Sequence, residues 1–307
     1  MSKHDFTQKP TVQFDPNNIA RSAEQPIQAN PLAGYFRQPS IYLKLPSGGK
    51  YYKPGTLTMN DQGEVAIYPM TARDEITFKT PDALMNGEAT KTVIESCVPD
   101  IKDPGNLPVL DLDALLIAIR IASYGEKMKV SSACPECKSA QEYEVSLPGE
   151  LEAIGTPQVE DKVSLGNGLT VHLKPLTLNQ INEIQRKSFE EQKLFNTVLD
   201  SQMTEEEKLI RFRDSFTKLT SMTVDIMIAN IEKIEAPTGV VTSKQHIAEF
   251  INNTEAKFFD AISKTVESFK QLGSTKTKKI ECEKCKKEGK AGEYETPLTF
   301  DASNFFA

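Results

Sequence analysis

Two short cysteine motifs constrain this chain more than any other feature of its sequence. Cys134-Pro135-Glu136-Cys137 and Cys282-Glu283-Lys284-Cys285 use four of the five cysteines, and nearly half of the chain separates them. A Cys-x-x-Cys turn presents two thiolates at the separation that a tetrahedral zinc ion needs, and two such turns complete a four-sulfur site. The spacing therefore predicts one structural zinc site, with these ligands: Cys134, Cys137, Cys282 and Cys285.

The residues that follow each motif support this pairing. A lysine comes directly after both, followed by similar strand-forming segments, Glu142-Tyr143-Glu144-Val145 after the first and Glu293-Tyr294-Glu295-Thr296 after the second. Two similar halves of this kind are typical of the arms of a zinc ribbon, so we expect a ribbon that is split by a long insertion. Four protein ligands leave no open coordination position, so the ion would be structural and not catalytic.

Two disulfides or a redox dithiol are the alternative interpretations of these cysteines. A redox pair is expected near a β-α-β pattern, and neither motif has one around it. Disulfides form in oxidising compartments, whereas the chain opens with Met1-Ser2-Lys3-His4-Asp5, without the apolar run of a signal peptide. The fifth cysteine, Cys97, lies in an apolar-rich segment and is expected to be a small buried core residue.

The balance of charge argues against nucleic-acid binding by the ribbon. The second motif is surrounded by lysines that would offset the negative charge of a zinc ion held by four thiolates: Lys278, Lys279, Lys284, Lys286, Lys287 and Lys290. The whole chain, however, has a net charge of −7 and a pI near 5.3, whereas phosphate binding needs a basic surface. No apolar run in the sequence is long enough for a membrane span.

The chain begins with a segment that has no hydrophobic period. Residues 1–38 are rich in Gln, Asn, Pro and Ser, and we expect them to form an extended tail. The tail carries scattered aromatic residues that could dock on a partner: Phe6, Phe14, Tyr35 and Phe36.

The pattern after the tail predicts an α+β platform. Residues 41–45 and 50–52 alternate around a Gly-containing turn, which indicates a β-hairpin, and a third strand is expected at residues 64–68. Helix signals follow, with caps at Thr71 and Thr80 and apolar segments at residues 89–97 and 112–124. The last of these, closed by Gly125, has almost no polar face, so we expect it to be buried on most sides. A strand at residues 142–147 completes the platform.

The region between the platform and the second motif changes from strand to helix patterns. A Pro/Gly-rich connection is expected at residues 148–157 and a β-hairpin at residues 162–173. Helices are then expected to begin at Thr177, Thr204 and Ser243 and to cover residues 224–234 and 255–272. The predicted organisation is a tail (1–38), a split-ribbon platform (39–147 with 274–307), a hairpin connection (148–175) and an all-α insertion (176–273).

Catalytic signatures are missing from the sequence. The three histidines, His4, His172 and His246, lie far apart, and no Gly-x-Ser-x-Gly or Gly-x-Gly-x-x-Gly motif occurs. The acidic run at residues 205–207 falls in a first helical turn, where negative charge is favourable for the helix dipole. We therefore expect a protein that is not an enzyme.

Four stretches taken together resemble one protein family. They are residues 45–52 (LPSGGKYY), 69–75 (PMTARDE), 79–84 (KTPDAL) and 113–125 (DALLIAIRIASYG). In combination they are similar to the baseplate hub proteins of contractile-tailed, T-even-type bacteriophages. The similarity covers about residues 40–150, including the first cysteine motif, and recurs more loosely at the second.

The resemblance implies that the protein is made in the host cytoplasm and lies in the tail baseplate of the virion. The expected partners are other phage tail and baseplate proteins, with several copies of the chain in the assembly and no nucleic acid bound. Two roles fit this expectation: a permanent structural subunit of the baseplate hub, or a transient assembly chaperone for hub proteins that leaves the finished particle. A nucleic-acid-binding zinc ribbon is a third interpretation, which the acidic chain disfavours.

Overall fold

The computed structural model describes residues 30–80, 87–200, 204–275, 277–290, 292–296 and 298. The chain divides into two parts, Met1–Arg37 and Gln38–Ala307. The described residues of the first part contain one short 3-10 helix, η1 (Ala33–Tyr35). Most of the predicted tail, with Phe6 and Phe14, lies outside the described residues, as does the helix expected after Thr80.

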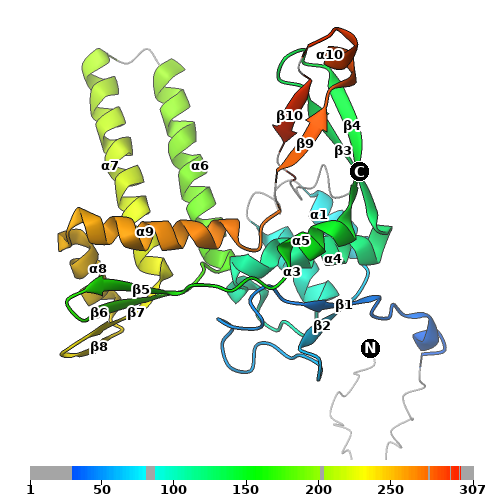
Figure 1. Ribbon diagram of the computed structural model, residues 1–307, viewed down its shortest axis with the longest axis horizontal. Helices are drawn as coiled ribbons and strands as arrows, with labels where there is room; N and C mark the ends of the chain where they lie inside the picture. The colour runs from blue at the N-terminus through cyan, green and yellow to red at the C-terminus, as the bar shows by residue number, and fades with distance from the viewer. Residues whose placement is uncertain are drawn as a thin grey trace, which may run out of the picture. The chain divides into compact units, whose positions relative to one another are not determined.

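The second part begins with the predicted α+β platform (Figure 1). Its elements are, in order, β1 (Ile41–Lys44), β2 (Glu64–Ile67), α1 (Ala72–Lys79), α3 (Glu88–Cys97), η2 (Pro104–Asn106), η3 (Val109–Asp111) and α4 (Leu112–Tyr124). The cap predicted at Thr71 is present, because its hydroxyl accepts from the N–H of Asp74 while the Asp74 carboxylate accepts from the N–H of Thr71. α4 ends at Gly125, whose φ of +93° suits glycine.

The helix α4 lies in the apolar core of the platform, as its sequence predicts. Leu115, Ile117 and Ile119 are fully buried. They belong to one cluster with strand residues such as Val65 and Ile67. Full burial of a side chain of this size contributes roughly 1.5–3 kcal/mol, so α4 and the strands stabilise one another.

The partner predicted for β1 is wrong. β1 pairs antiparallel with β2, with Ile41 opposite Ile67, whereas residues 50–52 form no strand. One reason is the backbone of Tyr51, which has a φ of +75° and so cannot continue a strand.

Hydrogen bonds to a buried carboxylate are the second reason why residues 50–52 do not form a strand beside β1. Asp111, at the end of η3, accepts hydrogen bonds from the N–H of Ser47 at 2.7 Å and from the hydroxyl of Tyr52 at 3.0 Å. These bonds hold the loop after β1 against the start of α4. The pairing of β1 is therefore decided by side-chain contacts with a residue far away in the sequence.

Two separate antiparallel hairpins carry the cysteine motifs. β3 (Lys127–Ala133) pairs with β4 (Ala140–Ser146), and β9 (Lys278–Glu281) pairs with β10 (Glu293–Thr296). The short helix α10 (Glu283–Lys287) lies between β9 and β10. The predicted strand at residues 142–147 corresponds to β4.

The connection predicted after β4 contains a helix instead of a loop. α5 (Leu147–Ile154) has Pro148 in its first turn, where a missing N–H costs nothing, and it ends at Gly155 with a φ of +56°. Leu147 and Ile154 are buried against the platform core. Pro148 and Gly155, which indicated a loop in the sequence, lie instead at the beginning and at the end of this short helix.

A second apolar core follows in the chain (Figure 1). Its elements are β5 (Lys162–Gly166), β6 (Leu169–Leu173), α6 (Leu178–Asp200), α7 (Glu205–Asn230), β7 (Ile231–Ala236), β8 (Gly239–Val241), α8 (Lys244–Asn253) and α9 (Ala256–Gln271). The strands form one antiparallel sheet in the order β5-β6-β7-β8. The hairpin predicted at residues 162–173 is confirmed as β5 and β6.

The insertion is not all-α, because β7 and β8 belong to its sheet. The helix predicted at residues 224–234 is wrong in its second half: α7 ends at Asn230, and the chain continues as β7. Ile231 and Ile234 are both buried, three positions apart, which imitates a helical spacing. In the structure a bulge in the pairing of β6 with β7 shifts the register between them, so both side chains reach the core from a strand.

The other helices of this region begin where their capping residues predict. The Thr177 N–H donates to the Gln180 side chain at 2.9 Å, and the Thr204 hydroxyl accepts from the N–H of Glu207. α8 follows Ser243, and α9 falls within the predicted range. The domain boundaries given above for the platform, connection and insertion stay predictions.

Candidate metal centre

The first cysteine motif forms the tight turn between β3 and β4. The N–H of Cys134 donates to the carbonyl of Ser139 at 3.0 Å, and the N–H of Lys138 donates to the carbonyl of Cys134 at 2.9 Å. Lys138 has a φ of +57°, which lets the chain reverse within the motif. These bonds point the side chains of Cys134 and Cys137 to the same side of the turn.

The second motif forms a turn of another kind, at the end of β9. The N–H of Cys282 donates to the carbonyl of Gly292 at 2.7 Å, and Cys285 lies in α10. Gly292 is needed here, because a Cβ at this position would lie 2.9 Å from the carbonyl oxygen of Cys282 and 3.3 Å from the Cβ of Cys285. The close approach of Gly292 is thus part of this turn, residues 282–290 and Gly292, which we call the second knuckle.

The four predicted ligands come together from the two hairpins. All four sulfur atoms lie within 4.8 Å of one another. The Sγ atoms of Cys134 and Cys285 are 3.8 Å apart, and those of Cys137 and Cys282 are 3.5 Å apart. A tetrahedral ion with Zn–S bonds of about 2.3 Å requires sulfur–sulfur separations of about 3.8 Å. The donor set and its spacing therefore fit a divalent metal ion such as zinc.

The same distances exclude disulfides within this geometry. All five cysteines are free, and a disulfide would need a sulfur–sulfur distance of about 2.0 Å. Cys134, Cys282 and Cys285 are buried, whereas Cys137 is partly exposed, and Tyr294 packs beside them. Four close thiols, three of them buried, are an arrangement that a metal ion would stabilise.

The environment of the thiols affects their pKa values unequally. Hydrogen bonding from Ser139, through its hydroxyl at 2.9 Å and its N–H, lowers the pKa of Cys137 to about 6. The N–H of Cys285 lowers the pKa of Cys282, while burial raises the pKa of Cys285 to about 12. A bound divalent cation favours the thiolate form of all four.

The lysines near the second motif are only partly available to offset this charge. Lys278 pairs with Glu150, Lys286 pairs with Glu281 and Lys290 pairs with Glu288. The pKa of Lys290 is raised mainly by Glu288, and also by the charges of Cys285 and Cys137.

Ser139 and Gly292 are the members of the site that the sequence did not identify. Ser139 approaches both Cys137 and Cys282, the latter at 3.6 Å. Gly292 closes the second knuckle. A polar residue two positions after one motif and a glycine seven positions after the other are too common to be recognised without the fold.

Other residues considered for chemistry lie elsewhere. Cys97 is buried in the platform core, as predicted. His172 on β6 lies 3.0 Å from Glu235 on β7, and His246 lies on α8. The four cysteines are the one group of potential metal ligands found in the described ranges. No helix in the same ranges has the length and hydrophobicity to span a bilayer.

A comparison with known protein families identifies the family of this chain. The family described as T4 bacteriophage base plate protein matches residues 38–300, which include the platform, both cysteine motifs and the second core. No curated protein and no solved structure matches the chain. The family places the chain in the virion tail baseplate, with other phage tail proteins as partners. The chain belongs to the T4 bacteriophage base plate protein family.

Proposed function

We propose that this chain is a structural, non-catalytic subunit of the baseplate hub, and that a zinc ion bound by four cysteines holds its two ribbon hairpins together. The observation that carries the structural role is the family match over residues 38–300. The observation that supports the zinc ion is the approach of Cys134, Cys137, Cys282 and Cys285 to within 4.8 Å.

Zinc would supply the strongest connection between the two hairpins. Away from the cysteines, the Ser132 hydroxyl on β3 donates to the Thr296 hydroxyl on β10 at 3.2 Å, and at the cysteines the contacts are weak ones between thiols or from the Ser139 hydroxyl to Cys282. A bound ion would add four metal–sulfur bonds, two from each hairpin. These bonds would fix the end of the chain to the platform, across the long insertion.

Exposed apolar side chains on α6 and α7 support a role in assembly. Phe189 on α6 and Leu209 and Phe216 on α7 expose more than half of their surface, at 51%, 70% and 63%. Apolar residues that recur along one helix usually pack against something. In a baseplate protein, neighbouring subunits are the natural source of that contact.

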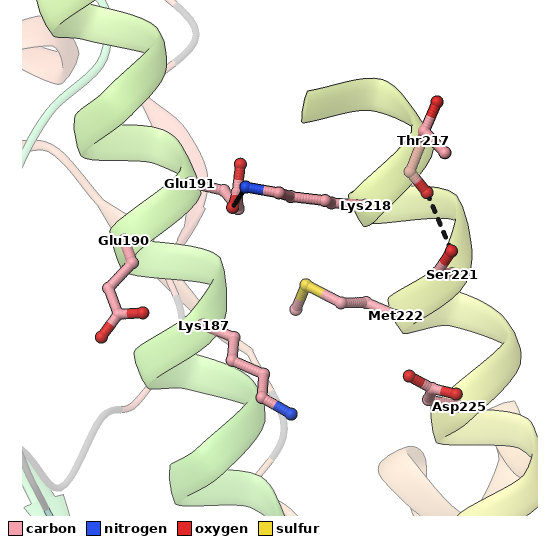
Figure 2. Close-up of a pocket in the computed structure, with 8 residues that line it drawn as sticks. All are labelled: Lys187, Glu190, Glu191, Thr217, Lys218, Ser221, Met222 and Asp225. Carbon is pink, nitrogen blue, oxygen red and sulfur yellow. Dashed lines mark hydrogen bonds and ion pairs between the residues drawn. The ribbon is translucent and has the colours of Figure 1, made fainter. Parts of the chain in front are cut away.

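The cavity between α6 and α7 supports a role without catalysis (Figure 2). Its volume is about 250 Å³, and Figure 2 shows Lys218 reaching across it to Glu191, at 2.9 Å. The hydroxyl of Ser221 donates to the carbonyl of Thr217 within α7, so no base activates it. The residues that line the cavity stabilise the pair of helices and form no nucleophile–base arrangement.

Mass spectrometry of purified virions tests the structural role. A permanent subunit would be present in mature particles at a fixed ratio to other baseplate proteins. Abundance in infected cells together with absence from mature particles would instead identify a transient assembly chaperone, the alternative role.

Paired cysteine variants test the zinc ion. Cys282→Ser with Cys285→Ser should remove the metal, loosen the ribbon and reduce assembly while most of the helical signal in circular dichroism remains. The physical reason is that the platform core has its own apolar cluster. Unchanged metal content in the double variant would reject the split site.

A further inference from the structure

The two hairpins that carry the cysteine motifs each have a strand, β4 in one and β9 in the other, whose outer edge has no backbone partner. In an antiparallel pair, residues alternate between those that exchange hydrogen bonds with the partner strand and those whose N–H and C=O point away from it. The N–H of Cys134 bonds to Ser139 and the N–H of Leu147 bonds to Glu126, both in the register of β3 with β4. Residues 142 and 144 of β4 therefore direct their N–H and C=O groups away from β3.

The same argument applies to β9. The N–H of Cys282 bonds to the carbonyl of Gly292, in the register that places Glu281 opposite Glu293. Because hydrogen-bonded pairs alternate, Lys279 and Glu281 direct their backbone groups away from β10. Both hairpins thus have an outer edge that is able to accept another strand.

These two edges border one groove. Its volume is about 490 Å³, and its lining includes the consecutive residues 141–146 of β4 and 278–281 of β9. Side chains alternate between the two faces of a strand, so one face would contribute every second residue. Consecutive residues line a groove when the edge of the strand faces it. The backbone groups that lack a partner strand therefore point into this groove.

The charge of the groove selects its occupant. Five glutamates line it against two lysines: Glu142, Glu144, Glu150, Glu281 and Glu283, with Lys278 and Lys279. Lys278 is paired with Glu150, Glu281 with Lys286, and Glu144 with Lys127 of β3 through an exposed ion pair at 2.7 Å that a basic side chain of the added strand would have to replace. Within the described part of the chain, neither Glu142 nor Glu283 takes part in an ion pair. Glu142 and Glu144 are two positions apart and so share one face of β4.

We propose that an extended, basic segment of another tail protein inserts between β4 and β9 as an added strand, with Lys or Arg at alternate positions facing Glu142 and Glu144. Addition of a strand to a free edge satisfies main-chain hydrogen bonds, while the alternate side chains give specificity. The proposal goes beyond the hub assignment, since it requires a folded ribbon but not a particular place in the baseplate.

Peptide binding to the full chain with its metal content measured tests the proposal. The probe is a fluorescein-labelled Val-Lys-Val-Lys-Val-Lys-Val peptide, compared with the same peptide carrying Glu in place of Lys. We expect the basic peptide to bind at least about tenfold more tightly, a difference of about 1.4 kcal/mol. Amide exchange at residues 142 and 144 should slow on binding. Equal binding of both peptides, or no binding to metal-loaded chain, would overturn the proposal.

Two proline variants test which strand edge the peptide uses. Glu144→Pro removes an N–H that points into the groove without removing a bond to β3, and should weaken peptide binding about tenfold. Lys129→Pro is the matched control, because residue 129 lies opposite Glu144 and directs its N–H to the other edge. Equal weakening by both variants would reject the groove as the site.

A charge variant keeps the test valid if proline disturbs the hairpin. Glu142→Lys with Glu144→Lys should weaken binding of the basic peptide about tenfold and strengthen that of the acidic one. Glu152→Lys, on an exposed position of α5 outside the groove, should change neither by more than about twofold. Loss of metal from the wild-type chain would count against the zinc proposal, whereas loss of peptide binding with metal retained counts against the groove alone.

Discussion

The platform core and the cysteine cluster are stabilised by different physical means. In the platform, α4 buries Leu115, Ile117 and Ile119 among strands and helices that contribute further aliphatic side chains. In the cysteine cluster the buried residues are cysteines, with Cys137 and Tyr294 partly buried beside them. The hydrophobic effect scales with apolar area, so it is strong in the first region and weak in the second.

The difference fits the proposal that the four thiols gathered between the hairpins bind a metal ion. A small cluster without aliphatic side chains cannot offset the conformational entropy of two ordered turns by burial alone. Metal–sulfur bonds would offset it, since structural zinc contributes on the order of 10 kcal/mol or more in small domains. Changes in the platform should therefore unfold the chain, whereas changes in the cluster should act on the ribbon and its metal.

The largest effect on global stability is expected in α4. Ile117→Ala removes a fully buried side chain and should lower the free energy of unfolding by about 3 kcal/mol. Urea unfolding followed by circular dichroism measures this change. Ile121→Ala, on a partly buried position of the same helix, is the matched control and should cost clearly less. Equal losses in the two variants would show that burial does not account for the stability of the platform.

A pH-dependent effect of similar size is expected from Asp111. Burial raises its pKa from 3.8 to about 6, although Ser47 and Tyr52 donate hydrogen bonds to it. Between these two values the folded chain binds more protons at this carboxyl than the unfolded chain does. The contribution of Asp111 to stability therefore falls as the pH rises from about 4 to about 6, by on the order of 3 kcal/mol, and is constant above that range.

Unfolding measured across this pH window in two variants isolates that contribution. Asp111→Asn should remove the fall in stability between about pH 4 and pH 6. Asp61→Asn, on an exposed turn of the platform, should keep it. The same pH profile in Asp111→Asn and in the wild-type chain would rule out Asp111 as its source.

A smaller and local effect is expected at the second knuckle. Gly292→Ala places a methyl group 2.9 Å from the Cys282 carbonyl oxygen and should displace that turn. We expect about tenfold weaker metal binding, measured by competition with a chelator, because the sulfur positions shift. The urea midpoint of the platform should change little. A large change in global stability with unchanged metal affinity would contradict the separation of the two regions.

The gathering of the four cysteines and the burial of α4 could be predicted because their signals are local. The spacing within each Cys-x-x-Cys motif sets the geometry of a pair of ligands, and the likeness of the two flanks indicated that the pairs belong together. The apolar run at residues 112–124 identified a buried helix without knowledge of its neighbours. Capping residues such as Thr71 and Thr204 marked helix starts through bonds made within one turn.

The misassigned elements depend on contacts between distant residues. The pairing of β1 with β2 follows from a loop that is held by Asp111, far along the chain. Ile231 and Ile234 have a helical spacing in the sequence, and only the bulge against β6 makes them strand residues that face the core. In both cases a local pattern allowed two structures, and tertiary packing selected one.

Elemental mass spectrometry of the purified chain tests the central claim most directly. One zinc per chain is expected, and it should be lost both in Cys134→Ser with Cys137→Ser and in Cys282→Ser with Cys285→Ser, because each pair supplies half of one site. X-ray absorption should then show four sulfur ligands at about 2.3 Å. Zinc retained at full occupancy in either double variant, or a wild-type chain without metal, would contradict a single centre that joins the two hairpins.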